Sequence, residues 1–146
     1  MPLLKMVASF GISNQKHNIL IDTGASVSIL PISLVSNMSL LDSSVRITAA
    51  NNMPIKVSGE VTTHISFRKL RRSYMWTFIV ADVTTPIIGL DFLQHYEFSI
   101  NCATGEVSDS NTNISAHAEV SKRDGLHSVQ INLPGNNSFV QYLRVN

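Results

Sequence analysis

The feature that most constrains this chain is an aliphatic run that ends abruptly in an acid and a tight turn, Ile19-Leu20-Ile21-Asp22-Thr23-Gly24. Consecutive aliphatic residues predict a buried strand. A carboxylate directly after them lies where the chain leaves the core, and desolvation there is expected to raise the pKa of Asp22. Thr23 supplies a hydroxyl for hydrogen bonds within the turn or across an interface. We expect Gly24 to give the turn a positive φ and to let another backbone approach closely.

Two interpretations of this stretch stay open at the level of residue types. Asp, Thr and Gly are all common in turns, so an ordinary strand-to-turn junction is one of them. The other is a functional acid, and the apolar character on both sides favours it. Ser26 to Leu30 alternates polar and apolar residues, which predicts a further strand after the turn.

Composition limits the class of protein. The chain has 146 residues, of which 44% are hydrophobic and 14% charged, so a single folded domain with a real core is expected. A formal net charge of +1 excludes a strong overall field for nucleic acid. No apolar run is long enough to span a bilayer, so no membrane partner is expected. A single cysteine, Cys102, and a start unlike a signal peptide predict a cytoplasmic protein.

Short β-prone runs separated by turn residues predict a series of strands. Two of them, 45–48 and 55–57, flank an Asn-containing turn and predict a hairpin. The others cover 3–10, 61–67, 73–80 and 97–102. Asp91 is placed to cap a short helix. Residues 108–115 are rich in Ser, Asn, Asp and Thr, which indicates a linker. We therefore divide the chain into a domain at 1–105 and a polar linker or tail at 106–146, which would lead toward a following domain.

A second motif, Pro86-Ile87-Ile88-Gly89-Leu90-Asp91-Phe92-Leu93, follows the Asp22-Thr23-Gly24-Ala25-Ser26 stretch and the hairpin. In this order the motifs resemble the retropepsin-like aspartic proteases, peptidase family A2, and most of all the proteases of gypsy-type LTR retrotransposons. The resemblance spans Leu3 to Cys102. It implies an all-β, closed orthogonal barrel with a flap hairpin and one short helix near residues 90–96. It also implies a homodimer, because each chain of the family contributes one catalytic Asp, and this sequence has no second Asp-Thr/Ser-Gly.

The resemblance assigns catalysis to Asp22, Thr23 and Gly24. The two Asp22 carboxyls of a homodimer would share a proton, since adjacent carboxylates cannot both ionise cheaply. The ionised one would activate a water and the protonated one would polarise the peptide carbonyl. Thr23 would hydrogen-bond across the dimer, and Gly24 would offer its backbone to the substrate. Neither a metal nor another cofactor is required.

By the same resemblance, Arg46 to Val57 is a flap that closes over an extended peptide. The residues expected to bind substrate are Leu20, Ala25, Ser26, Val27, Ala49, Ala50, Asn51, Thr85 and Ile87. Many retroviral members pair an Asp with an Arg at the positions of Ser26 and Leu90. Because both members of that pair are absent from this sequence, neither is left as a buried unpaired charge. Few residues precede the first strand here, so the dimer is expected to be weak or to use 98–102 and the tail.

Simpler interpretations were weighed for the other residues. Asp91 is expected to fix a loop or cap the helix rather than act as a second catalytic acid. The basic run 68–72 is expected to be a solvated connector, not a nucleic-acid site. The five histidines lack metal-ligand spacing. The sequence thus predicts an aspartic endopeptidase that processes a retroelement polyprotein, or a host-retained copy of one. The alternative is a catalytically silent module for dimerisation or peptide binding.

Overall fold

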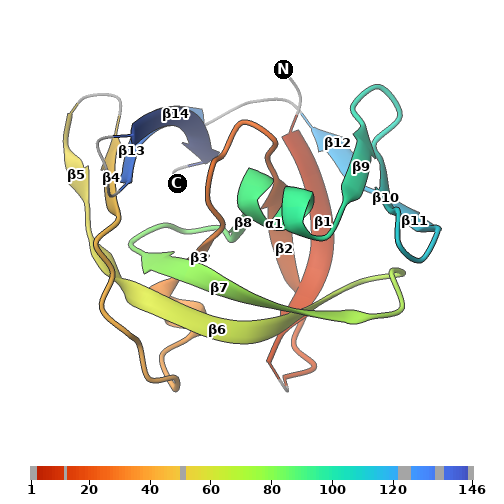
Figure 1. Ribbon diagram of the computed structural model, residues 1–146, viewed down its shortest axis with the longest axis horizontal. Coiled ribbons are helices and arrows are strands. Elements are labelled where there is room, and N and C mark those ends of the chain that lie inside the picture. Colours follow the sequence, from red (N-terminus) through yellow and green to blue (C-terminus); the bar gives the residue numbers. More distant parts are fainter. Residues whose placement is uncertain (1–2, 12, 50–51, 122–125, 134–136, 145–146) are drawn as a thin grey trace.

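Strands close into a barrel that forms the body of the molecule (Figure 1). The computed structural model describes residues 3–11, 13–49, 52–121, 126–133 and 137–144. Two strand pairs of the barrel, β2–β8 and β3–β7, are parallel, and the others are antiparallel. The prediction of an all-β, closed barrel is confirmed. The barrel order is β1 (Leu3–Phe10), β2 (His17–Ile21), β8 (Ile87–Ile88), β3 (Ile29–Pro31), β7 (Ser73–Ala81) and β6 (Val57–Phe67), which pairs back with β1.

The long strands β6 and β7 follow the alternation of their sequences. In β6 the side chains at 61, 63, 65 and 67 are buried, whereas Thr62 and His64 are exposed. In β7, Tyr74 and Phe78 are buried on the same side as the half-buried Trp76. One face of this pair therefore supplies much of the barrel core. The strand predicted over residues 26–30 begins only at Ile29, because residues 22–28 form a loop.

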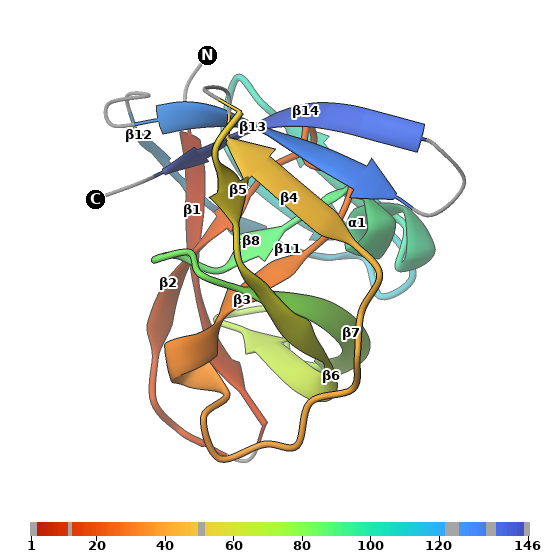
Figure 2. The same ribbon diagram turned by 90° about the vertical axis from the view of Figure 1, so that its left-hand side faces the viewer.

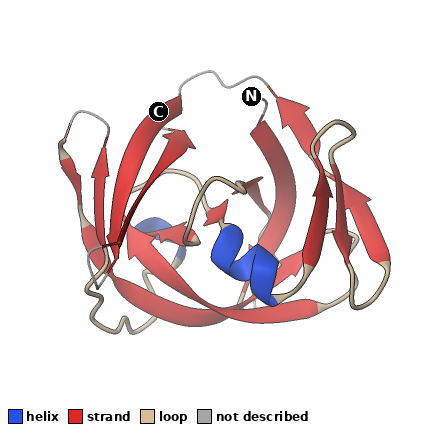
Figure 3. Cartoon of the chain, turned by 45° about the horizontal axis from the view of Figure 1, so that its top comes forward, coloured by secondary structure: helices blue, strands red, loops and turns tan. Residues whose placement is uncertain are grey.

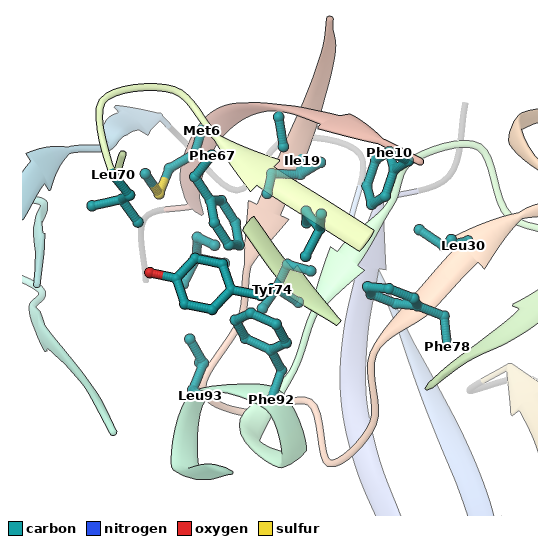
Figure 4. Close-up of a cluster of buried hydrophobic side chains, with 14 of the residues drawn as sticks. Met6, Phe10, Ile19, Leu30, Phe67, Leu70, Tyr74, Phe78, Phe92 and Leu93 are labelled. Atoms are coloured by element: carbon teal, nitrogen blue, oxygen red, sulfur yellow. The ribbon is translucent and has the colours of Figure 1, made fainter. Parts of the chain in front are cut away.

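Aromatic side chains fasten the short helix α1 (Leu90–His95) to the barrel (Figure 4). Phe92 of the helix meets Tyr74 edge to face, with ring centroids 5.5 Å apart, and meets Phe67 at 5.7 Å. Edge-to-face pairs of this kind add to the stabilisation that burial alone provides. Figure 3 shows α1 seated among the strands. The turn that precedes the helix is therefore fixed against the barrel.

The predicted hairpin is present as β4 (Arg46–Ala49) and β5 (Pro54–Ile55), joined in register at Ile47 and Ile55 (Figure 2). Asn52 has a φ of 65°, a left-handed conformation that asparagine tolerates better than most residues. The predicted tip residues Ala50 and Asn51 lie outside the described residues. A short 3-10 helix, η1 (Ile32–Leu34), follows β3.

Segments beyond residue 97 form further strands, and among those that the structure describes only β12 (Glu119–Ser121) pairs with a barrel strand. β9 (Phe98–Asn101), β10 (Glu106–Asp109) and β11 (Ile114–His117) form a three-stranded sheet, and β12 pairs with β1. β13 (Leu126–Leu133) pairs with β14 (Asn137–Arg144) and with β4. Residues 108–115, expected to be a linker, include the end of β10 and the start of β11, and Asp109 among them is fully buried. The division of the chain at residue 105 stays a prediction.

A buried acid, Asp109, ties this extra sheet to the barrel. Its carboxylate accepts a hydrogen bond from the Tyr74 hydroxyl at 2.5 Å, and lies 3.4 Å from the Arg72 guanidinium. Arg72 also stacks over the Tyr74 ring, 4.6 Å from its centroid. Burial, and then the hydrogen bond and negative charge of Asp109, raise the pKa of Tyr74 well above its ordinary value. The neutral phenol is therefore the form that the folded state favours.

We expect the stability of the protein to fall as pH rises above about 10, the pKa of tyrosine in an unfolded chain. There the folded state holds a Tyr74 proton that the unfolded state has lost, so the free energy of unfolding decreases with pH. Tyr74→Phe removes this proton, and its stability curve should be flatter in that range. Urea unfolding between pH 8 and 11 measures both proteins. Parallel curves would contradict the assignment.

Candidate active site

The site begins where β2 ends, and short β8 fixes the backbone there. Within the sheet, Leu20 aligns with Ile87 and Ile21 with Ile88. The hydrogen bonds continue into the loop, because the Asp22 N–H donates to the Ile88 carbonyl at 2.9 Å. The side chain of Asp22 thus begins at a position held by two chain segments, at the point where the aliphatic run leaves the core.

Hydrogen bonds within the turn are made to Asp22 itself. Ala25 N–H donates to the Asp22 carbonyl at 3.1 Å, and Gly24 N–H donates to Asp22 Oδ1 at 2.9 Å. Asp22 is half-buried, and Thr23 and Gly24 are exposed. The positive φ expected at Gly24 is wrong: among the described glycines, only Gly11, Gly59 and Gly105 have one. The upward pKa shift expected for Asp22 stays a prediction.

Gly89 is the place where the second motif touches the first. The Leu90 N–H donates to the Ala25 carbonyl at 2.7 Å. A Cβ at Gly89 would lie 2.5 Å from the Val27 carbonyl oxygen and 2.9 Å from that of Ala25. No side chain fits between these backbones. Gly89 also occupies the N-cap position of α1 that was predicted for Asp91.

We expect Gly89→Ala to destabilise the fold by about 2 kcal/mol, as overpacking of a close contact does. Because the displaced partner is the loop after Asp22, any peptidase activity should fall as well. Thermal unfolding and a peptide assay measure the two effects. Gly24→Ala is the comparison, since its Cβ would meet only Asp22 Oδ1, at 3.3 Å. Equal stability losses in the two variants would contradict this account.

An apolar wall lies between the loop and the β4–β5 hairpin. Of the residues predicted to bind substrate, Leu20, Ala25 and Ile87 are buried in this cluster and Val27 packs against it. Sequence reasoning missed several members, although the alternation of residues 45, 47, 55 and 57 along the hairpin could have indicated some of them. The missed members are Ile29, Val45, Ile47, Ile55, Val57, Ile79, Ala81 and Val83.

The remaining predicted residues lie around this wall. Thr85 lines a groove of about 400 Å³ together with Leu20, Lys5 and His17. Ala49 is the last residue of β4. Ser26 Oγ is buried and has no hydrogen-bond partner among the described residues. The structure therefore brings Leu20, Ala25, Val27 and Ile87 together in one cluster and leaves Thr85 at its side.

Asp91 lies 63 positions from Ser28 in the sequence and accepts two hydrogen bonds from it. It is thus occupied in holding the loop, as its expected loop-fixing role requires. Among the residues that the structure describes, no three His, Cys, Asp or Glu side chains gather in a way that could hold a metal ion. No helix in that part of the chain is long and apolar enough to cross a membrane.

Comparison with known proteins agrees with this arrangement. Residues 8–95 match the family described as "gag-polyprotein putative aspartyl protease". The retroviral protease-like domain of Ddi1 from Leishmania major is similar in structure, with a TM-score of 0.61 and 16% identity, over 82% of this chain and 95% of that one. The EIAV protease complexed with the inhibitor HBY-793 gives 0.51 and 20%, over 66% and 90%. No curated protein sequence matches the chain.

The barrel, the loop after β2 and the β8–α1 turn together define a retropepsin-like protease fold. The family match covers well over half of the 146 residues. The chain belongs to the gag-polyprotein aspartyl protease family.

Proposed function

We propose that this chain is an aspartic endopeptidase that cleaves extended peptide segments, with Asp22 as its catalytic acid. The observation that carries the proposal is the position of Asp22 in a fold of the aspartyl protease family. Its backbone is held by β8, its carboxylate accepts from Gly24, and an apolar wall lies beside it. The Asp-Thr-Gly sequence is complete, and a non-catalytic module has no physical need for it.

The proposed reaction uses two copies of the chain, one Asp22 from each. The ionised carboxylate takes a proton from a water molecule, whose oxygen attacks the peptide carbonyl carbon. The protonated carboxyl donates to the carbonyl oxygen, so a neutral geminal diol forms. The C–N bond then breaks as the leaving amine receives a proton from the carboxyl that took it from water, while the other carboxylate takes a proton from a diol hydroxyl, which yields the carboxylic acid product and restores the pair. The pair shares one proton because like charges so close cannot both ionise cheaply.

Unpaired strand edges support a homodimer. Among the described strands, β9 pairs only with β10, and β14 pairs only with β13. Each of them keeps an edge at which a second copy could add. A two-fold dimer would use the same surface of both copies and would place the two Asp22 loops in equivalent positions.

The wall beside Asp22 indicates the kind of peptide. Its aliphatic members that remain half-buried are available to a peptide, so apolar side chains next to the cleaved bond would be favoured; they are Val27, Val45, Ile55, Val57 and Val83. The natural substrate would be a polyprotein of a gypsy-type retroelement, or a target of a host-retained copy. The proposed place of action is the cytoplasm, because the chain's one cysteine, Cys102, is exposed and free.

A peptidase assay of the full chain with a peptide library at mildly acidic pH tests the proposal. We expect cleavage next to apolar residues by the wild type, and a loss of about a thousandfold or more in Asp22→Ala, because the general base is removed. Sedimentation at the assay concentration should give a dimer. Equal turnover by the two proteins would rule out Asp22 as the catalytic acid. No turnover by a folded wild-type dimer would leave the silent peptide-binding module as the function.

A further inference from the structure

A second carboxylate, Asp91, is hydrogen-bonded to the loop that follows β2 and contains Asp22. Asp91 Oδ1 accepts from the Ser28 hydroxyl at 2.7 Å and from the Phe92 N–H at 2.8 Å. Asp91 Oδ2 accepts from the Ser28 N–H at 3.1 Å and from the Trp76 indole N–H at 3.2 Å. All four partners donate. Three separate elements, the loop after β2, strand β7 and helix α1, therefore meet at one side chain.

The fully buried Ser28 links Asp91 to the turn between β8 and α1 as well. Its hydroxyl donates to Asp91, and its oxygen accepts from the Gly89 N–H at 2.9 Å. Gly89 in turn lies directly after β8, whose Ile88 carbonyl holds the Asp22 N–H. A change at Asp91 can thus reach the backbone of Asp22 by two routes, along the loop through Ser28 and along the β8–α1 turn.

We infer that Asp91 is a positioning residue for the proposed peptidase reaction. Through its hydrogen bond to Asp91, the environment of the Trp76 indole changes when the loop that contains Asp22 changes its conformation. The inference rests on the proposed function of Asp22. A carboxylate is required, because only it presents acceptor oxygens on both sides. An asparagine would turn its NH₂ group toward two donors, either Ser28 N–H with Trp76 N–H, or Ser28 Oγ–H with Phe92 N–H.

Asp91→Asn is the first variant to test. We expect kcat to fall about tenfold to a hundredfold, as the loss of two hydrogen bonds predicts, with KM changed by less than about threefold. A split of this kind indicates lost alignment of the reacting groups rather than lost peptide binding. Asp82→Asn is the matched control, since Asp82 is exposed and outside this network, and its kcat should equal that of the wild type.

Trp76 fluorescence provides a measurement that does not depend on turnover, since Trp76 is the only tryptophan in the sequence. The probe is the best library substrate with a secondary alcohol in place of the cleaved amide. Binding of this peptide to the wild type should change the Trp76 fluorescence, and the change should be lost in Asp91→Asn while the peptide still binds. A merely structural role for Asp91 would lower the melting temperature and leave this response intact.

Ser28→Ala, Asp91→Asn and the double variant together form a double-mutant cycle that completes the test. The two effects on kcat should not add, because both changes break the same connection. If Asp91→Asn does not fold, Trp76→Phe removes a single donor and should still lower kcat by about twofold to fivefold at unchanged KM. A wild type that cleaves no peptide overturns the proposed function. A cleaving wild type with the same kcat in folded Asp91→Asn, or in Trp76→Phe where that variant fails to fold, overturns the inference alone.

Discussion

Mixing the wild-type chain with an excess of Asp22→Asn chain is expected to suppress peptidase activity far more than dilution does. Each proposed site needs one Asp22 from each of two copies, so a mixed dimer has a single carboxylate and cannot run the reaction. With about a tenth of the chains wild-type and random pairing, roughly a hundredth of the dimers have two carboxylates. Activity should then lie about tenfold below that of the same wild-type chain without the variant.

The measurement is the initial rate of peptide cleavage after the mixture has exchanged subunits, at a total concentration where sedimentation gives a dimer. Asp82→Asn is the control partner, because that chain keeps Asp22 and should add activity instead of removing it. Activity that depends linearly on the wild-type fraction would show that one chain suffices for catalysis. The two-chain mechanism would then be wrong, although Asp22 could still be the catalytic acid.

The strands of the barrel could be predicted because they have local signatures, whereas their closure into a barrel was implied only by the family resemblance. In β6 and β7 the buried and exposed residues alternate in the sequence, and the hairpin around Asn52 has apolar flanks and a turn residue that suits a left-handed conformation. The Asp22 turn was found by the same means, from an aliphatic run that ends in an acid. Such features need only neighbouring residues, so a single sequence contains them.

Contacts between distant segments could not be predicted in this way. The four donors around Asp91 come from three parts of the chain, and only the fold brings Ser28 and Trp76 to it. The sequence predicted a helix just after Gly89. The close approach of Gly89 to the Val27 backbone, in contrast, arises only from tertiary packing. For Gly24, turn chemistry favoured a positive φ, whereas the side chain of Asp22 closes the turn without one.

The composition of residues 108–115 indicated a linker, whereas strands β10 and β11 extend into both ends of this segment. Ser, Asn, Asp and Thr are common in linkers, but the same residues can form short strands and tight turns when a few apolar positions face a core. Val107 and Ala116 face the core here, and Asp109 is buried because Tyr74 and Arg72 of the barrel meet its charge. A polar segment is therefore anchored by one buried acidic side chain, which no local pattern indicates.

That anchor gives the second large prediction. Asp109→Ala should lower the free energy of unfolding by about 3 kcal/mol, because it removes a fully buried carboxylate and leaves the Tyr74 hydroxyl, in a side chain only 1% exposed, without its partner. For a domain of this size the melting temperature should fall by about 6–12 °C. Asp42→Ala, at an exposed aspartate, should leave it nearly unchanged. Circular dichroism during heating measures all three proteins.

The double variant Asp109→Ala with Tyr74→Phe separates the two contributions to this loss. Removing the hydroxyl as well abolishes the unsatisfied donor, so the double variant should be less destabilised than the sum of the single variants by about 1 kcal/mol. Strict additivity would mean that the Tyr74–Asp109 hydrogen bond does not contribute in solution. The sheet β9–β10–β11 would then be held to the barrel by apolar contacts such as Val107 alone, and its polar residues would have the passive role that their composition suggested.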